Sequence, residues 1–138
     1  MALLIANINL ALQIVILAIL SIGMGYKRKG RFASHGSAML IAVVLNAVSF
    51  FLVMWPSFVT FDFSTLDSPI KIASLTHGIL GGIAEILGVF LVAAWGLQKT
   101  VQSCVRRRMI MRITIALWVV ALALGILLYA ALYGIITL

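Results

Sequence analysis

The chain has 138 residues, of which 64% are hydrophobic and only 9% are charged, and its formal net charge is +7. This composition excludes an ordinary soluble domain, because the connections between the long apolar segments are too short to bury a core of their own. The basic residues lie in loops and at the ends of apolar segments, so we attribute the charge to membrane topology and expect no nucleic-acid partner. We expect the lipid bilayer to be the environment of the protein.

Hydropathy predicts four membrane-spanning helices, at about residues 3–26, 33–55, 70–97 and 110–137. Each is long enough to cross roughly 30 Å of hydrocarbon at about 1.5 Å per residue. The first segment has no basic region before it, so we expect a retained span and not a cleaved signal peptide. Pro56 and Pro69 are expected to bound the connection between the second and third spans. We therefore predict an all-α membrane protein with a single domain, residues 1–138, folded as an antiparallel four-helix transmembrane bundle.

The distribution of basic residues predicts the orientation of this bundle. Nine of the ten Lys and Arg residues lie in or beside the first and third connections: Lys27, Arg28, Lys29, Arg31, Lys99, Arg106, Arg107, Arg108 and Arg112. By the positive-inside bias both basic connections face the cytoplasm, which places both termini and the loop carrying Asp62 and Asp67 outside. We expect a multi-pass protein of the plasma membrane.

Polar residues within the spans indicate which helix faces lie inside the bundle, since such residues in lipid-embedded helices face other helices. One stripe of the second span follows alternating steps of four and three, through His35, Met39, Ala42, Asn46, Ser49 and Val53. His77 and Glu85 share one face of the third span. The predicted buried polar seam consists of Asn9, Gln13, Asn46, Glu85 and Tyr129.

The depths of the two histidines predict two separate polar neighbourhoods. At about 1.5 Å per residue, His35 and His77 differ in height by roughly 24 Å, so one haem iron or metal ion cannot bind both. The inner neighbourhood is expected to contain His35, Met39, Met111 and Arg112. The outer neighbourhood is expected to contain His77, Asn9, Gln13, Tyr129 and Tyr133.

Each ionisable or soft side chain in the spans has a structural and a functional interpretation. His77 is either a structural histidine bonded to Gln13 or a tyrosine, or a contact for metal, haem or quinone. His35 can reach water or lipid phosphate, and Met39, one turn away, either packs or acts as a soft ligand for haem iron or copper. Glu85 is expected to be neutral and hydrogen-bonded to Asn46, or else to mark a proton or ion path.

Motifs of several enzyme classes are absent from the sequence. It contains no phosphate-binding glycine loop followed by Lys, no His-Glu-x-x-His motif, no Cys-x-x-Cys and no nucleophile elbow. We therefore expect a protein that is not an enzyme.

Three stretches carry a resemblance to a known family: "SHGSAMLIAVV" (34–44), "LTHGILGGIAEILGVFLVAAWGL" (75–97) and "RRRMIMRITIALWVVALALGILLYAALYG" (106–134). The pattern resembles the small multi-span membrane proteins that include YozB and CtaM. The resemblance implies a role in maturation of haem-copper terminal oxidases, with His35, Met39 and His77 as candidate haem or copper ligands. Members often carry a histidine where this chain has Arg106–Arg108, which leaves His35 and Met39 as the implied ligands on the cytoplasmic side.

The leading hypothesis is a non-enzymatic integral membrane accessory protein that assists assembly or stability of a respiratory haem-copper terminal oxidase, with a terminal oxidase as its membrane-protein partner. One alternative is a small b-type haem-binding protein that transfers electrons or acts as a sensor. Another is a structural subunit of a larger membrane complex.

Overall fold

Four helices of the computed structural model, which describes residues 2–97 and 101–137, are long and apolar enough to cross a membrane. They are α1 (Ala2–Arg28), α4 (Ser68–Leu97), α6 (Arg108–Leu132), and a continuous run of α2 (Phe32–Ser49), the π-helix η1 (Phe50–Met54) and α3 (Trp55–Thr60). A 3-10 turn, η2 (Phe63–Thr65), and a short helix, α5 (Val101–Arg106), lie in the connections. The expected all-α four-helix bundle is confirmed.

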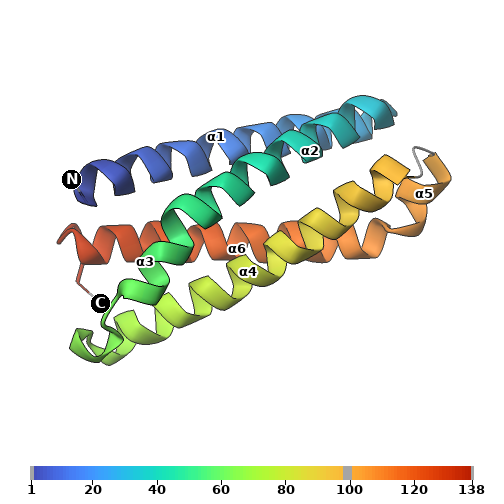
Figure 1. Ribbon diagram of the computed structural model, residues 1–138. Helices are drawn as coiled ribbons and strands as arrows, with labels where there is room; N and C mark the ends of the chain where they lie inside the picture. The colour runs from blue at the N-terminus through green and yellow to red at the C-terminus, as the bar shows by residue number, and fades with distance from the viewer. Residues whose placement is uncertain (1, 98–100, 138) are drawn as a thin grey trace.

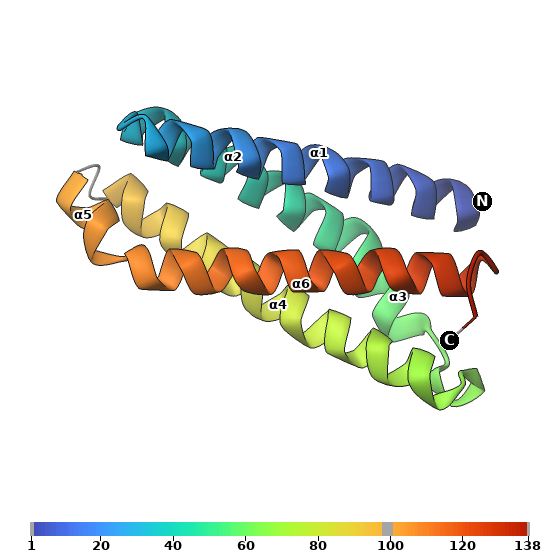
Figure 2. The same cartoon turned by 180° about the vertical axis from the view of Figure 1, so that it is seen from behind.

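The bundle consists of two antiparallel helix pairs. α1 packs most closely along α2 and α4 along α6, whereas α2 meets α4 less extensively and α1 touches α6 only lightly. Figures 1 and 2 show that the chain runs up and down in turn, so that both termini and the connection from α3 to α4 lie at one end of the bundle. We call this end the loop end, and the opposite end, where α1 joins α2 and where α5 lies, the basic end.

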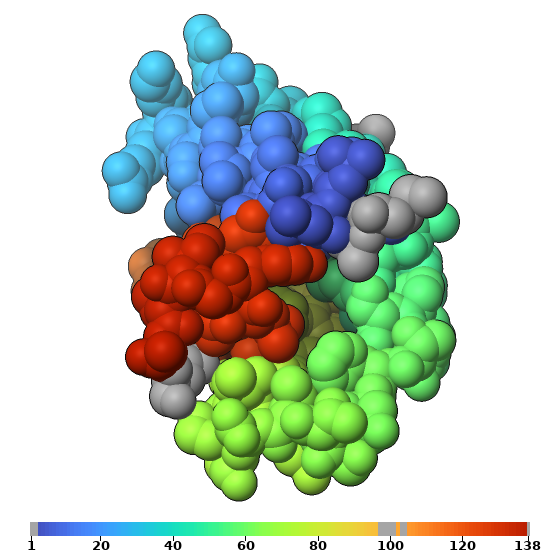
Figure 3. Space-filling model, turned by 90° about the vertical axis from the view of Figure 1, so that its left-hand side faces the viewer, coloured from blue at the N-terminus to red at the C-terminus, as the bar shows by residue number. Residues whose placement is uncertain are grey.

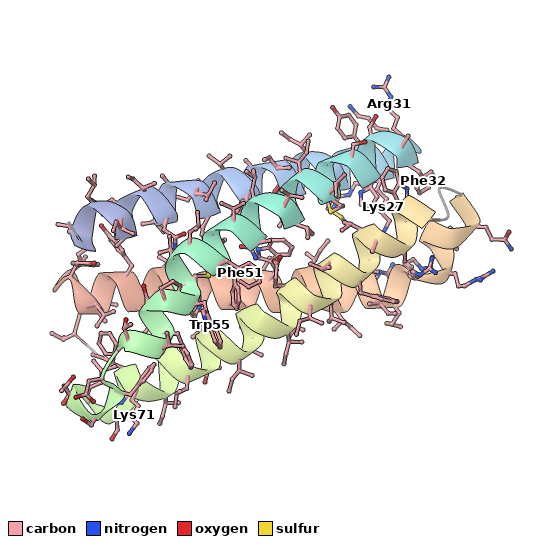
Figure 4. All side chains as sticks on the ribbon, in the orientation of Figure 1. Lys27, Arg31, Phe32, Phe51, Trp55 and Lys71 are labelled. Carbon is pink, nitrogen blue, oxygen red and sulfur yellow. The ribbon has the colours of Figure 1, made fainter. Side chains whose placement is uncertain are left out.

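Basic side chains mark the two ends very unequally. Lys27 and Arg31 lie at the basic end, whereas Lys71 lies at the loop end (Figure 4). Arg106–Arg108 also belong to the basic end, because they span the junction of α5 and α6. Lys99 lies outside the described residues.

Glycine terminates two of the long helices. Gly30 and Gly134 have φ values of 74° and 72°, a left-handed conformation that glycine adopts without steric cost. After α6 the Ile135 N–H donates to the Ala130 carbonyl at 2.8 Å, and the Gly134 N–H donates to Ala131 at 3.3 Å. These two bonds form a Schellman motif. This cap ends the fourth helix at Leu132. We predicted an end at residue 137, because hydropathy does not reveal the cap.

The second helix continues beyond its predicted end. We expected it to stop at residue 55, before Pro56, but the helical run reaches Thr60. The Trp55 N–H donates to the carbonyl of Phe50, five residues earlier, as in a π-helix. Because a proline ring clashes with the carbonyl four residues before it in a regular α-helix, the wider π turn lets the helix pass through Pro56. Pro69 likewise lies inside the first turn of α4, where no N–H is needed.

Asp62 organises the short loop between α3 and α4. Its carboxylate accepts hydrogen bonds from the Ser64 hydroxyl at 2.6 Å and from the Ser64 N–H at 3.0 Å. These bonds favour the charged form, and they lower the pKa of Asp62 below its usual value. The Asp62 side chain thus caps η2.

Small residues allow the core to be narrow at mid-bundle. The buried core cluster comprises Ile16, Leu20, Ala42, Val43, Ala84 and Trp118. A Cβ at Gly88 would lie 3.1 Å from Val43, so α2 and α4 approach closely there, whereas the nearest atom at Gly81 would be 4.0 Å away. Large apolar side chains such as Leu4, Phe51 and Ile86 point outward, which fits a surface facing lipid tails.

Candidate functional site

A cavity of about 280 Å³ lies toward the basic end, between α1, α2, α4 and α6. Its lining includes His35, Met39, Met111 and Arg112, the four residues expected in the inner neighbourhood. We call it the basic-end cavity. Most of its wall is apolar and includes the indoles of Trp95 and Trp118, with Lys27, His35, Arg112 and Thr114 as the polar side chains among the described residues.

His35 is held in one tautomer by the backbone of α1. Its Nδ1 lies 2.9 Å from the carbonyl oxygen of Gly23. A carbonyl can only accept, so Nδ1 carries a proton, and the neutral ring has its lone pair on Nε2. The side chain is 5% exposed. Our expectation that His35 reaches water or lipid phosphate is therefore wrong, because the Gly23 carbonyl is its partner.

Two glycines shape the wall of the basic-end cavity. A Cβ at Gly23 would lie 2.3 Å from the methyl carbon of Met39, and a Cβ at Gly36 would lie 2.3 Å from the Trp95 ring. The absence of side chains at both positions lets Met39 pack against α1 and lets the indole lie flat against α2.

A chain of hydrogen bonds crosses three helices near the middle of the bundle. Gln13 Nε2 donates to Asn46 Oδ1 at 3.2 Å and to Ser49 Oγ at 3.1 Å. Asn46 Nδ2 then donates to Glu85 Oε2 at 2.6 Å, while the Ser49 hydroxyl donates to Asn9 Oδ1. We call these five residues the polar chain. It contains the predicted bond between Asn46 and Glu85, and it joins α1, α2 and α4.

Glu85 is the buried end of the polar chain. Its side chain is 6% exposed, and its second oxygen, Oε1, is buried without a hydrogen-bond partner in the part of the chain that the structure describes. An ionised carboxylate at this position would have the Asn46 amide as its hydrogen-bond donor among the described residues and no neighbouring positive charge there, and burying such a charge in hydrocarbon is costly. The neutral acid is the less costly form, although a proton on Oε1 then lacks an acceptor.

A second cavity, of about 470 Å³, lies toward the loop end. Figure 3, which views this end, shows the surface hollowed between α6 and the segment that leads from α3 into α4. The cavity brings together the whole expected outer neighbourhood: His77, Asn9, Gln13, Tyr129 and Tyr133. We call it the loop-end cavity.

The partner of His77 differs from both expected partners. We predicted a bond to Gln13 or to a tyrosine, but Nδ1 lies 2.7 Å from the carbonyl oxygen of Ala121 on α6. Gly125 makes this approach possible, because a Cβ there would lie 3.0 Å from His77 Cε1. As in His35, the carbonyl accepts from Nδ1–H, and the lone pair of the neutral ring is on Nε2.

Tyr129 does not belong to the polar chain, although we predicted it in the seam. Its hydroxyl donates to Asn7 Oδ1 instead, and so links α6 to α1. We did not predict a role for Asn7. Ser49 lies on the predicted inward stripe of the second span but not in the predicted seam, and it connects Gln13 to Asn9.

The two histidines line different cavities, so one chain does not bring both to a single iron or copper ion. Among the described residues no three His, Cys, Asp or Glu side chains gather as a metal site. Comparisons with protein-family models, with curated proteins and with solved structures find no match to this chain.

Proposed function

We propose that this multi-pass membrane protein is a non-enzymatic accessory protein that assists assembly or stability of a respiratory haem-copper oxidase by holding haem or copper in the basic-end cavity. The observation that carries the proposal is the gathering of His35, Met39 and Met111 around one largely apolar cavity. The resemblance in the three quoted stretches supports the choice of oxidase as the partner.

The donor atoms of this cavity suit a soft metal or a haem iron. The backbone bond of His35 leaves Nε2 as the ring nitrogen that can bind a metal. The thioether of Met39 lines the same cavity, and a His and Met pair is a known ligand type for copper(I) and for haem iron. A bound haem or copper would be the cargo that the oxidase needs, while the role of this chain is to hold it away from water.

The proposed orientation puts the basic end in the cytoplasm and the protein in the plasma membrane. Its support is the charge difference between the two ends, with Lys27 and Arg31 at one end and Lys71 at the other. The basic-end cavity would then load from the cytoplasmic side, close to the lipid phosphates.

Deletion of the gene tests the proposed function in cells. We expect lower oxidase haem content and activity, restored by the wild-type gene but not by His35→Leu or Met39→Leu. Met109→Leu is the matched control, because Met109 is 67% exposed and lines neither cavity. Normal oxidase haem content and activity after deletion would contradict the proposal.

Titration of the purified protein separates the two cargoes. Haem binding is followed by the Soret band, and copper(I) binding by competition with a chromophoric copper(I) chelator. We expect one of the two to bind at one equivalent per chain, and His35→Leu to weaken it by at least about tenfold. If neither haem nor copper(I) binds, cargo holding is wrong, whatever the deletion shows.

A further inference from the structure

The loop-end cavity is built from uncharged residues. Thirty of the described residues line it, and none of these thirty is Lys, Arg, Asp or Glu. A phospholipid phosphate or a free ion would therefore lose its hydration without meeting a counter-charge, which is unfavourable in a low-dielectric site. This lining selects for a neutral ligand.

Eight Phe, Trp and Tyr rings line this cavity. They are Phe50, Trp55, Phe58, Phe61, Phe63, Trp118, Tyr129 and Tyr133. Several already pack in edge or tilted contacts, with ring centroids 5.2 Å apart for Phe58 and Phe63 and 6.3 Å apart for Phe50 and Trp55. Rings favour offset or edge contacts with other rings, so this wall fits a flat aromatic ligand better than an acyl chain.

The polar groups of the cavity include acceptors that the fold leaves unused. Gln13 has two amide hydrogens, which are donated to Asn46 and Ser49, so Gln13 can offer a ligand only its carbonyl oxygen. His77 donates Nδ1–H to Ala121 and can offer the lone pair of Nε2. A ligand that carries hydroxyl donors matches both groups.

We propose that the loop-end cavity binds the head group of a membrane quinol, with its ring among the aromatic side chains and one hydroxyl donating to His77 Nε2. The cavity volume of about 470 Å³ lies within the roughly 300–1,000 Å³ typical of small-molecule sites. This site is independent of the proposed cargo site, since it uses the other cavity and the other histidine.

Tryptophan fluorescence provides a direct binding measurement, since Trp55 and Trp118, two of the three tryptophans, line the cavity. The full chain in lipid nanodiscs is titrated under anaerobic conditions with ubiquinol-1 and with its oxidised form, ubiquinone-1, against empty nanodiscs. We expect saturable quenching and tighter binding of the quinol. Loss of one hydrogen bond in His77→Leu weakens the quinol by about tenfold. His35→Leu, the matched change in the other cavity, leaves its affinity within about twofold.

A cavity-filling substitution tests the same site without removing a polar group. A Cβ at Gly82, which lines the cavity, meets no atom within 4 Å, so Gly82→Leu adds its side chain at an open position of the cavity wall. Gly96 on the same helix is equally open and lines neither cavity, so Gly96→Leu is its control. We expect Gly82→Leu to abolish saturable quenching and Gly96→Leu to leave it unchanged.

Three results would overturn the quinol site. One is quenching that rises without saturation, as it does in empty nanodiscs. Another is a quinol affinity that stays the same in Gly82→Leu, which decides the matter even where His77→Leu does not fold. The third is a phospholipid that co-purifies in the cavity at one equivalent and is not displaced by ubiquinol-1.

Discussion

Asn46 holds together three of the four membrane helices through its side-chain amide. Its oxygen accepts from Gln13 on α1, and its nitrogen donates to Glu85 on α4. Both ends of one small side chain are therefore used, in a region where water cannot replace a lost partner. The bond to Glu85 also reduces the cost of burying the carboxyl group, of which Oε1 is already without a partner.

Substitution of Asn46 should therefore destabilise the bundle more than substitution of Glu85. We expect Asn46→Leu to lower the free energy of unfolding by about 1–2 kcal/mol, because it leaves Gln13 and Glu85 without their partner. Glu85→Gln keeps an oxygen that accepts from Asn46 and removes the ionisable group, so a smaller change is expected. Reversible unfolding in mixed micelles measures both. A larger loss in Glu85→Gln would mean that the bundle needs the charge or the acid proton of Glu85.

Close contacts between helices occur at glycines, which have no side chain. α2 and α4 meet where the Trp95 ring lies against Gly36, and α1 and α2 meet where Met39 lies against Gly23. The first contact is rigid, because an indole cannot bend away as a methionine can. Gly36 therefore fixes the spacing of α2 and α4 at the basic end.

Gly36→Ala should separate these two helices. Its Cβ would lie 2.3 Å from the Trp95 ring, and such overpacking costs about 1–3 kcal/mol. Gly25→Ala is the control, since a Cβ there meets nothing within 4 Å and should stabilise α1 by up to about 1 kcal/mol. Thermal unfolding and the emission of Trp95 report the difference. Equal stability of the two variants would contradict the close contact between Gly36 and Trp95.

At the scale of the whole molecule, the two ends of the bundle differ in charge and in the cavity that lies nearest. The basic-end cavity contains Met and His donors, whereas the loop-end cavity contains aromatic rings and uncharged acceptors. Glu85 and Asn46 lie between them along α4 and α2, one turn from Gly88 and Val43 of the basic-end cavity. Asn9, Gln13 and Asn46 of the polar chain line the loop-end cavity and not the basic-end cavity, whereas Trp118 on α6 lines both.

The orientation of the whole molecule can be measured with single cysteines in a Cys104→Ser background. Ser64 in the loop and Lys29 at the basic end are both exposed. In intact cells we expect a membrane-impermeant maleimide to label Ser64→Cys, and to label Lys29→Cys only after permeabilisation, because basic connections stay in the cytoplasm. The reverse labelling would contradict the proposed orientation and the cytoplasmic loading of the basic-end cavity.

Several features of the tertiary structure could be predicted from the spacing of residues along the sequence. Four spans, the pairing of Asn46 with Glu85 and the separation of His35 from His77 all rest on helix rise and helix period, which are local properties of the chain. Residues at similar heights on inward faces must meet in a narrow bundle. The residues predicted for the inner neighbourhood line one cavity, and those predicted for the outer neighbourhood line the other.

Other features were decided only by the tertiary structure. His35 and His77 both donate to backbone carbonyls, and since every residue carries a carbonyl, no side-chain pattern could identify Gly23 or Ala121 as the acceptor. Helix continuation through Pro56 also depended on a π turn that hydropathy does not encode.

The sequence by itself thus determined the environment, the helices and the height of each polar group, because apolar length and periodicity act along one helix at a time. The tertiary structure decided how far apart neighbouring helices stand, because the rotation and crossing of helices depend on the fit of glycines against rings, such as Gly36 with Trp95 between α2 and α4 and Gly125 with His77 between α6 and α4. That spacing leaves a cavity at each of the two polar neighbourhoods that the helix heights predicted.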